Sequence, residues 1–318
     1  MSGALASHVF SFVPGPSADS VSLAPVWKQN GGTSIEPGGS AAVVLSLGAR
    51  DVLLVYDRAG EKVGAYHLTD GAPWVASVDS AITLTGGPWD QLESFVLGNA
   101  TYLLTYRADK GVFGIFEINS DLHASPPYTF AFPRNWPTPG FTTVKPFSQF
   151  GNQYVLGYGT SDGKVGIYGI TTTTASQGGI PALVGQNVWY HTWAAGWQRF
   201  AFFQLGGVTF FFKINVKKLN VNIDHVNDNP ATGTVEVGSL LQDKLPDAAA
   251  LDIAAIVPWR RDEPYLLTYV REKGAADLYR IHADCQGWTK VGSATAPGAS
   301  LVVPYRVGGG SFALFYGG

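Results

Sequence analysis

The chain has little cysteine and little charge. Its 318 residues include one cysteine, Cys285, and only 14% of them are charged. A single cysteine excludes an intramolecular disulfide framework and a zinc site built on paired cysteines. The net charge is −3 and no basic cluster is present, so there is no electrostatic reason to expect binding to nucleic acid or to an anionic membrane. No apolar run is long enough to cross a bilayer.

Signals for export and for cofactors are also missing. Residues Met1–His8 contain neither a basic region nor an apolar stretch of the kind that precedes a cleavage site, which predicts a cytoplasmic protein. The six histidines lack metal-ligand spacing, and no glycine-rich phosphate loop lies between a strand and a helix. We therefore expect no cofactor, no metal and a small molecule as the partner. The oligomeric state stays open.

Helical periodicity is the third absence. No stretch shows a sustained helical repeat of apolar residues. The 39 glycines, the 19 prolines and an aromatic content of 13% are typical of many short strands joined by tight turns. The chain is therefore predicted to be all-β.

A block of about fifty residues recurs six times along the chain. Its clearest part is an apolar run that ends in tyrosine in five of the six copies: Leu53–Tyr56, Leu103–Tyr106, Val155–Tyr158, Phe211–Ile214, Leu266–Tyr269 and Ala313–Tyr316. A polar turn and an alternating strand, such as Val112–Phe116, follow most of these runs.

The sixth copy is completed at the other end of the chain, where His8–Val13 supplies the strand that it lacks. A repeat that is completed by joining the two ends describes a closed ring. We predict a six-bladed β-propeller, closed by pairing of the N- and C-terminal strands, that forms a single domain over residues 1–318. A seven-bladed ring is the alternative, if residues 172–196 or 226–250 contain additional strands.

A second recurring segment precedes each apolar run, and we expect it to form the innermost strand of each blade. The six segments are Gly39–Leu45, Trp89–Phe95, Phe141–Phe147, Trp197–Phe203, Ile253–Trp259 and Ala299–Tyr305. Their third and fifth positions share one face of the strand. In copies two to four these positions include Gln91, Glu93, Thr143, Lys145 and Arg199, whereas in copies one, five and six they are apolar.

This uneven pattern predicts a central channel with one polar wall and one apolar wall. Such a channel suits one amphiphilic ligand better than six copies of a sugar, whose ligand residues would recur in register. The alternative is a satisfied polar patch between blades, for example Glu93 paired with Lys145 or with Arg199, because buried charges usually need partners. The two interpretations are compatible.

The blade pattern resembles that of the tectonin-like and the fungal or bacterial propeller lectins. The residues that carry the resemblance are Gly140-Phe141 to Pro146-Phe147, Gly196-Trp197, and Tyr102 to Gly111. The chain is also similar to the small fungal hetero-Diels–Alderases of tropolone-sesquiterpenoid biosynthesis, which join a quinone methide to a terpene. The lectin-like pattern covers nearly the whole chain but builds blades, and says little about ligands.

These observations lead to one expected function and two alternatives. We expect a cofactor-independent biosynthetic enzyme, a pericyclase of the hetero-Diels–Alder type, with Lys145 or Arg199 donating a hydrogen bond to a carbonyl. Gln91 or Thr143 would orient this partner. The other substrate-binding candidates are Glu93, Trp197, Trp259, Leu301, Val303 and Tyr305. A carbohydrate-binding lectin with pockets between blades is the main alternative, and a protein-interaction scaffold is the other.

Overall fold

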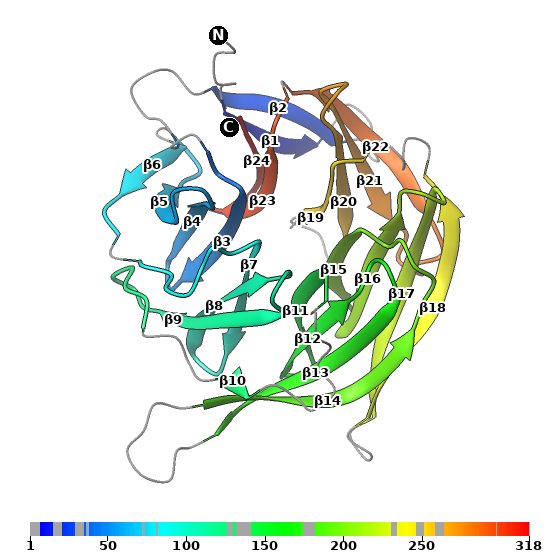
Figure 1. The fold of residues 1–318 in the computed structure, drawn as a ribbon. Helices are drawn as coiled ribbons and strands as arrows, with labels where there is room; N and C mark the ends of the chain where they lie inside the picture. The colour runs from blue at the N-terminus through cyan, green and yellow to red at the C-terminus, as the bar shows by residue number, and fades with distance from the viewer. Residues whose placement is uncertain are drawn as a thin grey trace.

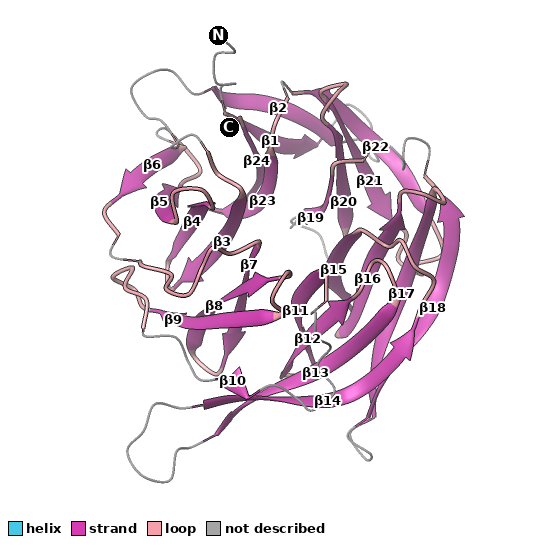
Figure 2. Cartoon of the chain, in the orientation of Figure 1, coloured by secondary structure: helices cyan, strands magenta, loops and turns pink. Residues whose placement is uncertain are grey.

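The computed structural model describes residues 7–14, 21–28, 35, 38–71, 74–80, 82–125, 130–131, 141–173, 182–229, 234–245, 251–257, 264–296 and 298–317. In these residues the regular structure consists of strands, without a helix (Figure 2). Six antiparallel sheets stand around a central axis like the blades of a propeller (Figure 1). The predicted fold class is therefore confirmed.

The strands of the first three blades follow each other outward from the axis. Blade one contains β3 (Ala41–Leu47), β4 (Arg50–Asp57), β5 (Lys62–Leu68) and β6 (Val75–Val78). Blade two contains β7 (Gln91–Leu97), β8 (Ala100–Arg107) and β9 (Val112–Ile118). Blade three contains β11 (Thr143–Gln149), β12 (Asn152–Tyr158), β13 (Lys164–Thr173) and β14 (Ala182–Thr192), with the short β10 (Phe130–Ala131) added parallel to the edge of β14.

The other three blades repeat this order. Blade four contains β15 (Arg199–Leu205), β16 (Val208–Asn215), β17 (Asn220–Asn229) and β18 (Thr234–Lys244). Blade five contains β19 (Ile253–Val257), β20 (Tyr265–Val270), β21 (Ala275–Ile281) and β22 (Trp288–Thr295). Blade six contains β23 (Leu301–Val307), β24 (Gly310–Tyr316), β1 (His8–Pro14) and β2 (Val21–Lys28).

Blade six closes the ring, because it combines strands from both ends of the chain. β1 pairs antiparallel with β24, with His8 opposite Phe315, and these two strands lie side by side in Figure 1. Within the two stretches that left a seventh blade open, the strands that the structure describes are the long outer strands of blades three and four, β13 with β14 and β17 with β18. The ring has six blades.

The register corrects the predicted inner strands. In five blades the strand begins two residues later than expected, at the third position of the segment, and this residue pairs with the end of the apolar run, as Ala41 does with Tyr56. In blade five Ile253 is the residue opposite Tyr269. The inner segment of blade five therefore begins two residues earlier than predicted from the sequence. Leu251 holds its first position, Ile253 the third and Ala255 the fifth.

Each pair of neighbouring blades encloses its own apolar cluster, and six such clusters link the ring. Glycines in the alternating strands admit the large rings of these clusters. A Cβ on Gly166 would lie 2.6 Å from the hydroxyl oxygen of Tyr168 on the same strand. Because close-packed interiors do not tolerate such an approach, the Gly-x-Tyr pattern of the third strand is a packing requirement.

The tyrosine that ends each second strand connects its blade to the next one through its hydroxyl group. Tyr56 accepts a hydrogen bond from the backbone N–H of Trp89 at 3.2 Å, and Tyr106 donates to the carbonyl of Phe141 at 2.7 Å. The remaining bonds of this type are Trp197 N–H to Tyr158 at 3.3 Å, Ala299 N–H to Tyr269 at 2.8 Å and Gly39 N–H to Tyr316 at 3.0 Å. We call this contact the tyrosine latch. In every case it reaches the first position of the next inner segment.

Blade four has no latch, because Ile214 stands where the tyrosine would be. At this junction a guanidinium nitrogen of Arg199 donates instead to the carbonyl of Leu251, at 3.5 Å. Leu251 is the first-position residue of blade five, so Arg199 contacts the same backbone site by a longer bond. The junction between blades four and five is therefore built differently from the other five.

Replacing Tyr106 with phenylalanine tests the latch. The change removes the hydroxyl and leaves the buried carbonyl of Phe141 without this donor, so we expect a loss of about 1–3 kcal/mol in the free energy of unfolding. Tyr305→Phe is the matched control, because the Tyr305 hydroxyl is buried without a hydrogen-bond partner. Urea unfolding should therefore show little change in this control. Equal losses in both variants would contradict the latch.

Alkaline pH should weaken the fold. Burial raises the pKa of Tyr106 and of Tyr305 above the ordinary value, so the folded state keeps these protons after the unfolded chain, with a tyrosine pKa near 10, has lost them. Stability is then lost as pH rises above about 10, by up to about 1.4 kcal/mol per pH unit for each tyrosine. Burial lowers the pKa of Lys213, which acts in the opposite direction only below about 10.4. Between about pH 10.5 and 11.5 the slope comes from the buried tyrosines and, below about pH 11, also from the buried Cys285 thiol. In urea unfolding, Tyr106→Phe should flatten this slope.

Candidate functional site

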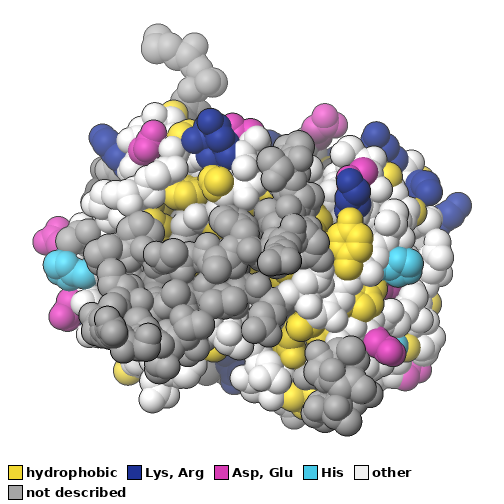
Figure 3. Space-filling view, turned by 60° about the horizontal axis from the view of Figure 1, so that its bottom comes forward, with side chains coloured by type: hydrophobic (Ala, Val, Ile, Leu, Met, Phe, Trp, Pro, Cys, Tyr) yellow, Lys and Arg dark blue, Asp and Glu magenta, His cyan; other side chains and the backbone are white. Residues whose placement is uncertain are grey.

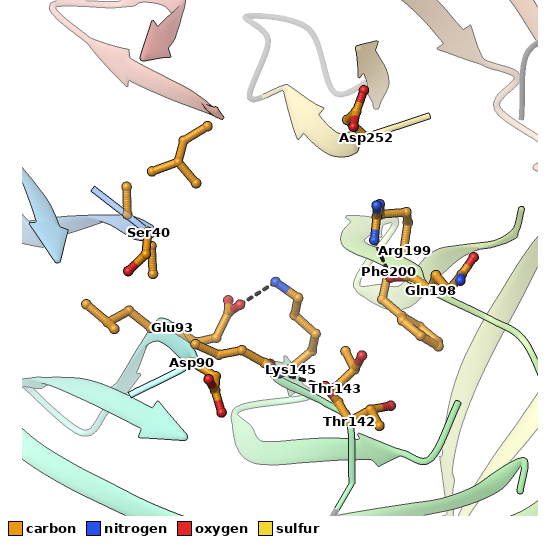
Figure 4. A pocket seen from close by; sticks show the side chains of 15 residues that line it. Ser40, Asp90, Glu93, Thr142, Thr143, Lys145, Gln198, Arg199, Phe200 and Asp252 are labelled. Atoms are coloured by element: carbon orange, nitrogen blue, oxygen red, sulfur yellow. Dashed lines mark hydrogen bonds and ion pairs between the residues drawn. The ribbon is translucent and has the colours of Figure 1, made fainter. Parts of the chain in front are cut away.

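A cavity of about 430 Å³ opens on the axis of the ring, at the end where the inner strands begin. All six blades contribute to its wall (Figure 4). The lining residues are Ser40, Ala41, Ala42, Asp90, Gln91, Leu92, Glu93, Thr142, Thr143, Lys145, Gln198, Arg199, Phe200, Asp252 and Leu301. Its volume lies within the range of small-molecule sites, about 300–1,000 Å³. We call it the axial pocket.

Side chains at the third and fifth positions of the inner strands border the channel, and they also bond to neighbouring blades. Gln91 of blade two bonds to blade three, and Ser94, on the opposite face of the same strand, bonds to Val44 of blade one. This differs from the expected face that looks directly at the axis. The physical reason is that each blade stands edge-on to the channel, so both faces of its inner strand pack against neighbouring blades.

Glu93 and Lys145 form an ion pair at the wall of the axial pocket. Their side chains are 21% and 30% exposed, and Figure 4 shows the Lys145 amine reaching back from blade three to the carboxylate on blade two. The pairing of Glu93 with Lys145 was one of the alternatives expected from the sequence, and it is confirmed. The amine of Lys145 therefore lies at the pocket with one acceptor already present.

Gln91 holds two blades together at the channel. Its amide nitrogen donates to the carbonyl of Thr142 at 2.8 Å, and its amide oxygen accepts from the backbone N–H of Val144 at 3.0 Å. The side chain thus completes hydrogen bonds of the neighbouring strand. Thr143, expected to orient a ligand together with Gln91, also lines the pocket. A ligand would meet only the part of the Gln91 amide that these two bonds leave free.

Arg199 is the cation of the axial pocket that has no acidic partner. Its guanidinium donates to the carbonyls of Gln198, at 3.3 Å, and Leu251, at 3.5 Å, and its Nε is buried without a partner. Among the described residues it forms no salt bridge. Burial lowers its pKa, with the nearby Asp252 acting in the opposite direction. An arginine placed in this way can still donate a hydrogen bond to an anionic or carbonyl oxygen of a ligand.

A ring of polar residues at the mouth of the pocket was missed in the sequence analysis. The second position of the six segments reads Ser40, Asp90, Thr142, Gln198, Asp252 and Ser300. Four of these side chains accept a hydrogen bond from the backbone N–H two residues after the latch tyrosine of the same blade, for example Asp90 from Ala108 at 2.9 Å and Asp252 from Arg271 at 2.6 Å. The signal was the presence of a polar residue at this position in every copy.

The pocket is less divided into two walls than expected, because this ring also brings polar groups from blades one and five. Ala41 and Leu301 supply apolar surface on the side of blades one and six. Phe200 and Leu92 add apolar surface within the blades that carry the charges. The wall therefore alternates polar and apolar patches around the axis, with the free guanidinium on one side.

Several predicted substrate-binding residues lie away from the axial pocket. Trp197 is 4% exposed and packs between blades three and four. Tyr305 is 2% exposed and stacks on Phe312 between blades six and one, with ring centroids 5.4 Å apart. Val303 packs against the same cluster. Trp259 lies outside the described residues. The cause is the edge-on orientation of the blades, which directs these side chains into the seams.

A buried lysine explains the position of two tryptophans. Lys213 on β16 pairs with Asp224 on β17, and the two side chains are 6% and 1% exposed. The Lys213 amine lies 3.8 Å from the ring centroid of Trp193 and 4.9 Å from that of Trp197. An opposite charge and two indole faces stabilise the buried ammonium. Both tryptophans therefore serve packing between blades, although Trp197 was expected to bind the substrate.

Other candidate chemistry has no support in the described part of the chain. No group of three or more histidine, cysteine, aspartate or glutamate side chains is arranged for a metal ion within the described ranges. Cys285 is buried, which raises the pKa of its thiol to about 11. The segment Gly159-Thr160-Ser161-Asp162-Gly163, whose sequence matches the Gly-x-Ser-x-Gly pattern of serine hydrolases, forms the turn between β12 and β13.

On the face seen in Figure 3, the charged side chains of the described residues are not gathered in one place. In Figure 3 lysine, arginine and acidic side chains are scattered over the described part of the visible face. Among the described residues no helix is long and apolar enough to pass through a bilayer. The axial pocket therefore remains the candidate site with the strongest chemical character.

Comparison with known proteins supports the fold. No protein-family model matches the chain, and no curated protein matches it. A proposed 6-phosphogluconolactonase from Bacteroides uniformis is similar in structure, with a TM-score of 0.52 and 13% identity over 96% of this chain and 87% of the other. A second such protein, from Bacteroides fragilis, has a TM-score of 0.53 and 14% identity over 96% of this chain and 85% of the other.

An exo-β-1,3-galactanase from Phanerochaete chrysosporium has a TM-score of 0.49 and 10% identity, covering 90% of this chain and 68% of the other. At identities of 13% and 14%, the likeness to the two Bacteroides proteins shows a shared fold and nothing finer. None of these three structures is a tectonin lectin or a hetero-Diels–Alderase, so both resemblances stay predictions.

A double-mutant cycle measures the ion pair of the pocket. Glu93→Gln, Lys145→Gln and the double variant should give a coupling energy of up to about 1 kcal/mol in urea unfolding, because the pair is only partly buried. The pair of Lys164 and Asp162, with side chains 49% and 47% exposed, is the matched control and should couple more weakly. A coupling near zero at the Glu93–Lys145 pair would contradict the contact.

Proposed function

We propose that the protein is an enzyme that binds one small molecule in the axial pocket through a carbonyl or carboxylate oxygen. The observation that carries the proposal is Arg199, a partly buried guanidinium with only backbone acceptors at the wall of a pocket of about 430 Å³. Leaving such donors unsatisfied is unfavourable. A ligand oxygen would supply the missing acceptor.

Arg199 is a better candidate than Lys145 for the activating donor. Lys145 already bonds to Glu93, and this carboxylate would compete with a ligand for the amine. Lys145 would then act as a second donor on the other side of the ligand, with Glu93 fixing its position. Ala41 and Leu301 would contact the apolar part of the substrate.

The reaction that we propose is a hetero-Diels–Alder cycloaddition between a quinone-methide-type heterodiene and an alkene such as a terpene. One C–O bond and one C–C bond form, three π bonds become one, and no atom, proton or electron leaves the pair. A hydrogen bond from Arg199 to the carbonyl oxygen makes the heterodiene more electrophilic and strengthens as charge builds up on that oxygen. The pocket adds rate by holding both partners together.

Arg199→Gln should lower kcat/KM for such a cycloaddition by about 10- to 150-fold, which corresponds to the loss of one charge-assisted hydrogen bond of about 1.5–3 kcal/mol. The measurement uses a quinone methide generated in solution, an alkene partner and chiral product analysis. Arg271→Gln is the matched control, because Arg271 bonds to the carbonyls of Ala299 and Ser300 at the next junction and does not line the pocket.

Unchanged activity in Arg199→Gln, with the fold intact, would refute the role of this residue. Sugar lactones belong in the same substrate panel, because two structural neighbours carry the name of a lactonase. Hydrolysis of a lactone without cycloaddition would keep the pocket and replace the reaction. Lack of any ligand binding in the pocket would refute the proposal as a whole.

The lectin alternative rests on pockets between blades, and those pockets are unlike one another. The one between blades three and four is lined by aromatic rings with Ser148 and Thr209, and the one between blades one and two by backbone-rich turns around Asn99 and Asn119. Repeated sugar sites would share their ligand residues. A glycan array with multivalent binding would nevertheless favour the lectin over the enzyme.

A further inference from the structure

A second cavity lies in the seam between blades six and one. Its volume is about 360 Å³, and its lining consists of Gly39, Val55, Asp57, Lys62, Val63, Gly64 and Tyr66. All of them belong to the start of blade one, β4 and β5. Val55 and Tyr66 lie on the face that packs against β23 and β24, whereas the side chain of Val63 packs toward blade two. The axial pocket shares none of the residues that line this cavity. We call this second cavity the seam slot.

The corresponding place in blades two and three is filled by an aromatic ring of the protein itself. In blade two Trp89 holds the first position, and a Cβ on Gly114 would lie 3.0 Å from its Cζ2. In blade three Phe141 holds that position, and a Cβ on Gly157 would lie 2.1 Å from its Cδ2. The ring of Phe141 also lies 6.2 Å, between centroids, from that of Tyr168.

The register makes these places equivalent to the seam slot. Gly64 is opposite Val55 in blade one, as Gly114 is opposite Thr105 in blade two and Gly166 opposite Gly157 in blade three. The walls of the slot are thus the residues that would surround a first-position ring. In blade one the first position is Gly39, which has no side chain, and the ring is missing.

Val55 fills only part of the space. It stands where blade three has Gly157, and a Cβ on Gly39 would lie 2.5 Å from its Cγ1. The rest of the space is the seam slot, between Val55, Val63, Gly64 and the ring of Tyr66. The equivalent place holds an indole ring in blade two and a phenyl ring in blade three. The seam slot is therefore expected to have a shape that accepts such a ring.

The mouth of the slot is charged. Lys62 is exposed and forms no salt bridge within the described residues. Asp57 accepts a hydrogen bond from the backbone N–H of Ala59 at 2.9 Å, and its other carboxylate oxygen is near Gly60. A molecule in the slot would bury its apolar end and present a polar substituent to these groups.

We propose that the seam slot is a second ligand site, which takes the ring of a small aromatic molecule with a polar substituent at one end. The ring occupies the place that Trp89 and Phe141 occupy in blades two and three. Stacking near Tyr66 and contact with Val55 hold it, since aromatic rings contribute large buried areas and favour such neighbours. The site is independent of the function proposed for the axial pocket.

Indole is the probe for this site. Isothermal titration and protein-observed NMR on the intact chain should detect one indole per chain, with shifts centred on Val55, Val63 and Tyr66. Arg199→Gln should leave indole affinity unchanged, which separates this site from the axial pocket. Absence of indole binding, or shifts confined to the axial pocket, would overturn the proposal.

The decisive variant copies the pair of blade three into blade one. Gly39→Phe combined with Val55→Gly reproduces Phe141 and Gly157 and places the missing ring in the slot. The φ of Gly39 lies outside the left-handed region, so its backbone accepts a side chain. We expect at least a tenfold loss of indole affinity with an equal or higher melting temperature. Unchanged affinity in a folded double variant would refute the site.

Two further variants keep the test decisive if the double variant does not fold. Val55→Gly alone enlarges the slot, and indole affinity should stay or increase. Val55→Phe adds a ring to the wall of the slot itself and should lower the affinity at least tenfold. The opposite result in either variant contradicts the assignment. Self-association that competes with indole would assign the slot to a side chain of a second copy and also overturn it.

Discussion

The ring depends on one repeated constraint: each blade must present a flat, close-packed face to the next one. The tyrosine latch joins this packing to hydrogen bonding, because the hydroxyl group reaches the backbone just before the inner strand of the following blade. Tyr56, Tyr106 and Tyr158 form such bonds at successive junctions. Aromatic side chains with a polar end suit this place, since their rings fill the seam and their hydroxyls satisfy buried backbone groups.

Both candidate sites arise where this repeat is broken. Ile214 replaces the tyrosine of blade four, and Arg199 reaches the freed backbone of Leu251 from the wall of the axial pocket. Gly39 replaces the first-position ring of blade one and leaves the seam slot. In a repeat protein the intact positions build the scaffold, so departures from the pattern are the natural places for ligand contacts. The two breaks lie at different junctions and bear on different ligands.

Charge in the axial pocket is divided between structure and chemistry. Gln91 and the mouth residues Asp90 and Asp252 use their oxygens to hold strands and turns together. Glu93 and Lys145 neutralise each other. Arg199 is left as the group with donors to spare. The inner strands of blades two to four carry several polar residues, but most of these are occupied by contacts within the protein. One cation, Arg199, is therefore the principal candidate for ligand binding.

The sequence by itself determined the all-β class, the six blades and the closure of the ring, because the apolar runs and their spacing repeat whatever their surroundings. It also indicated the pairing of Glu93 with Lys145, since two opposite charges on neighbouring inner strands need partners. Only the tertiary structure decided that Trp197 and Tyr305 lie in seams, that Leu251 and not Ile253 holds the first position, and that Arg199 lacks an acidic partner. The direction and the partners of a side chain depend on the orientation of each blade relative to its neighbours. An alignment of the six sequence copies does not contain this orientation.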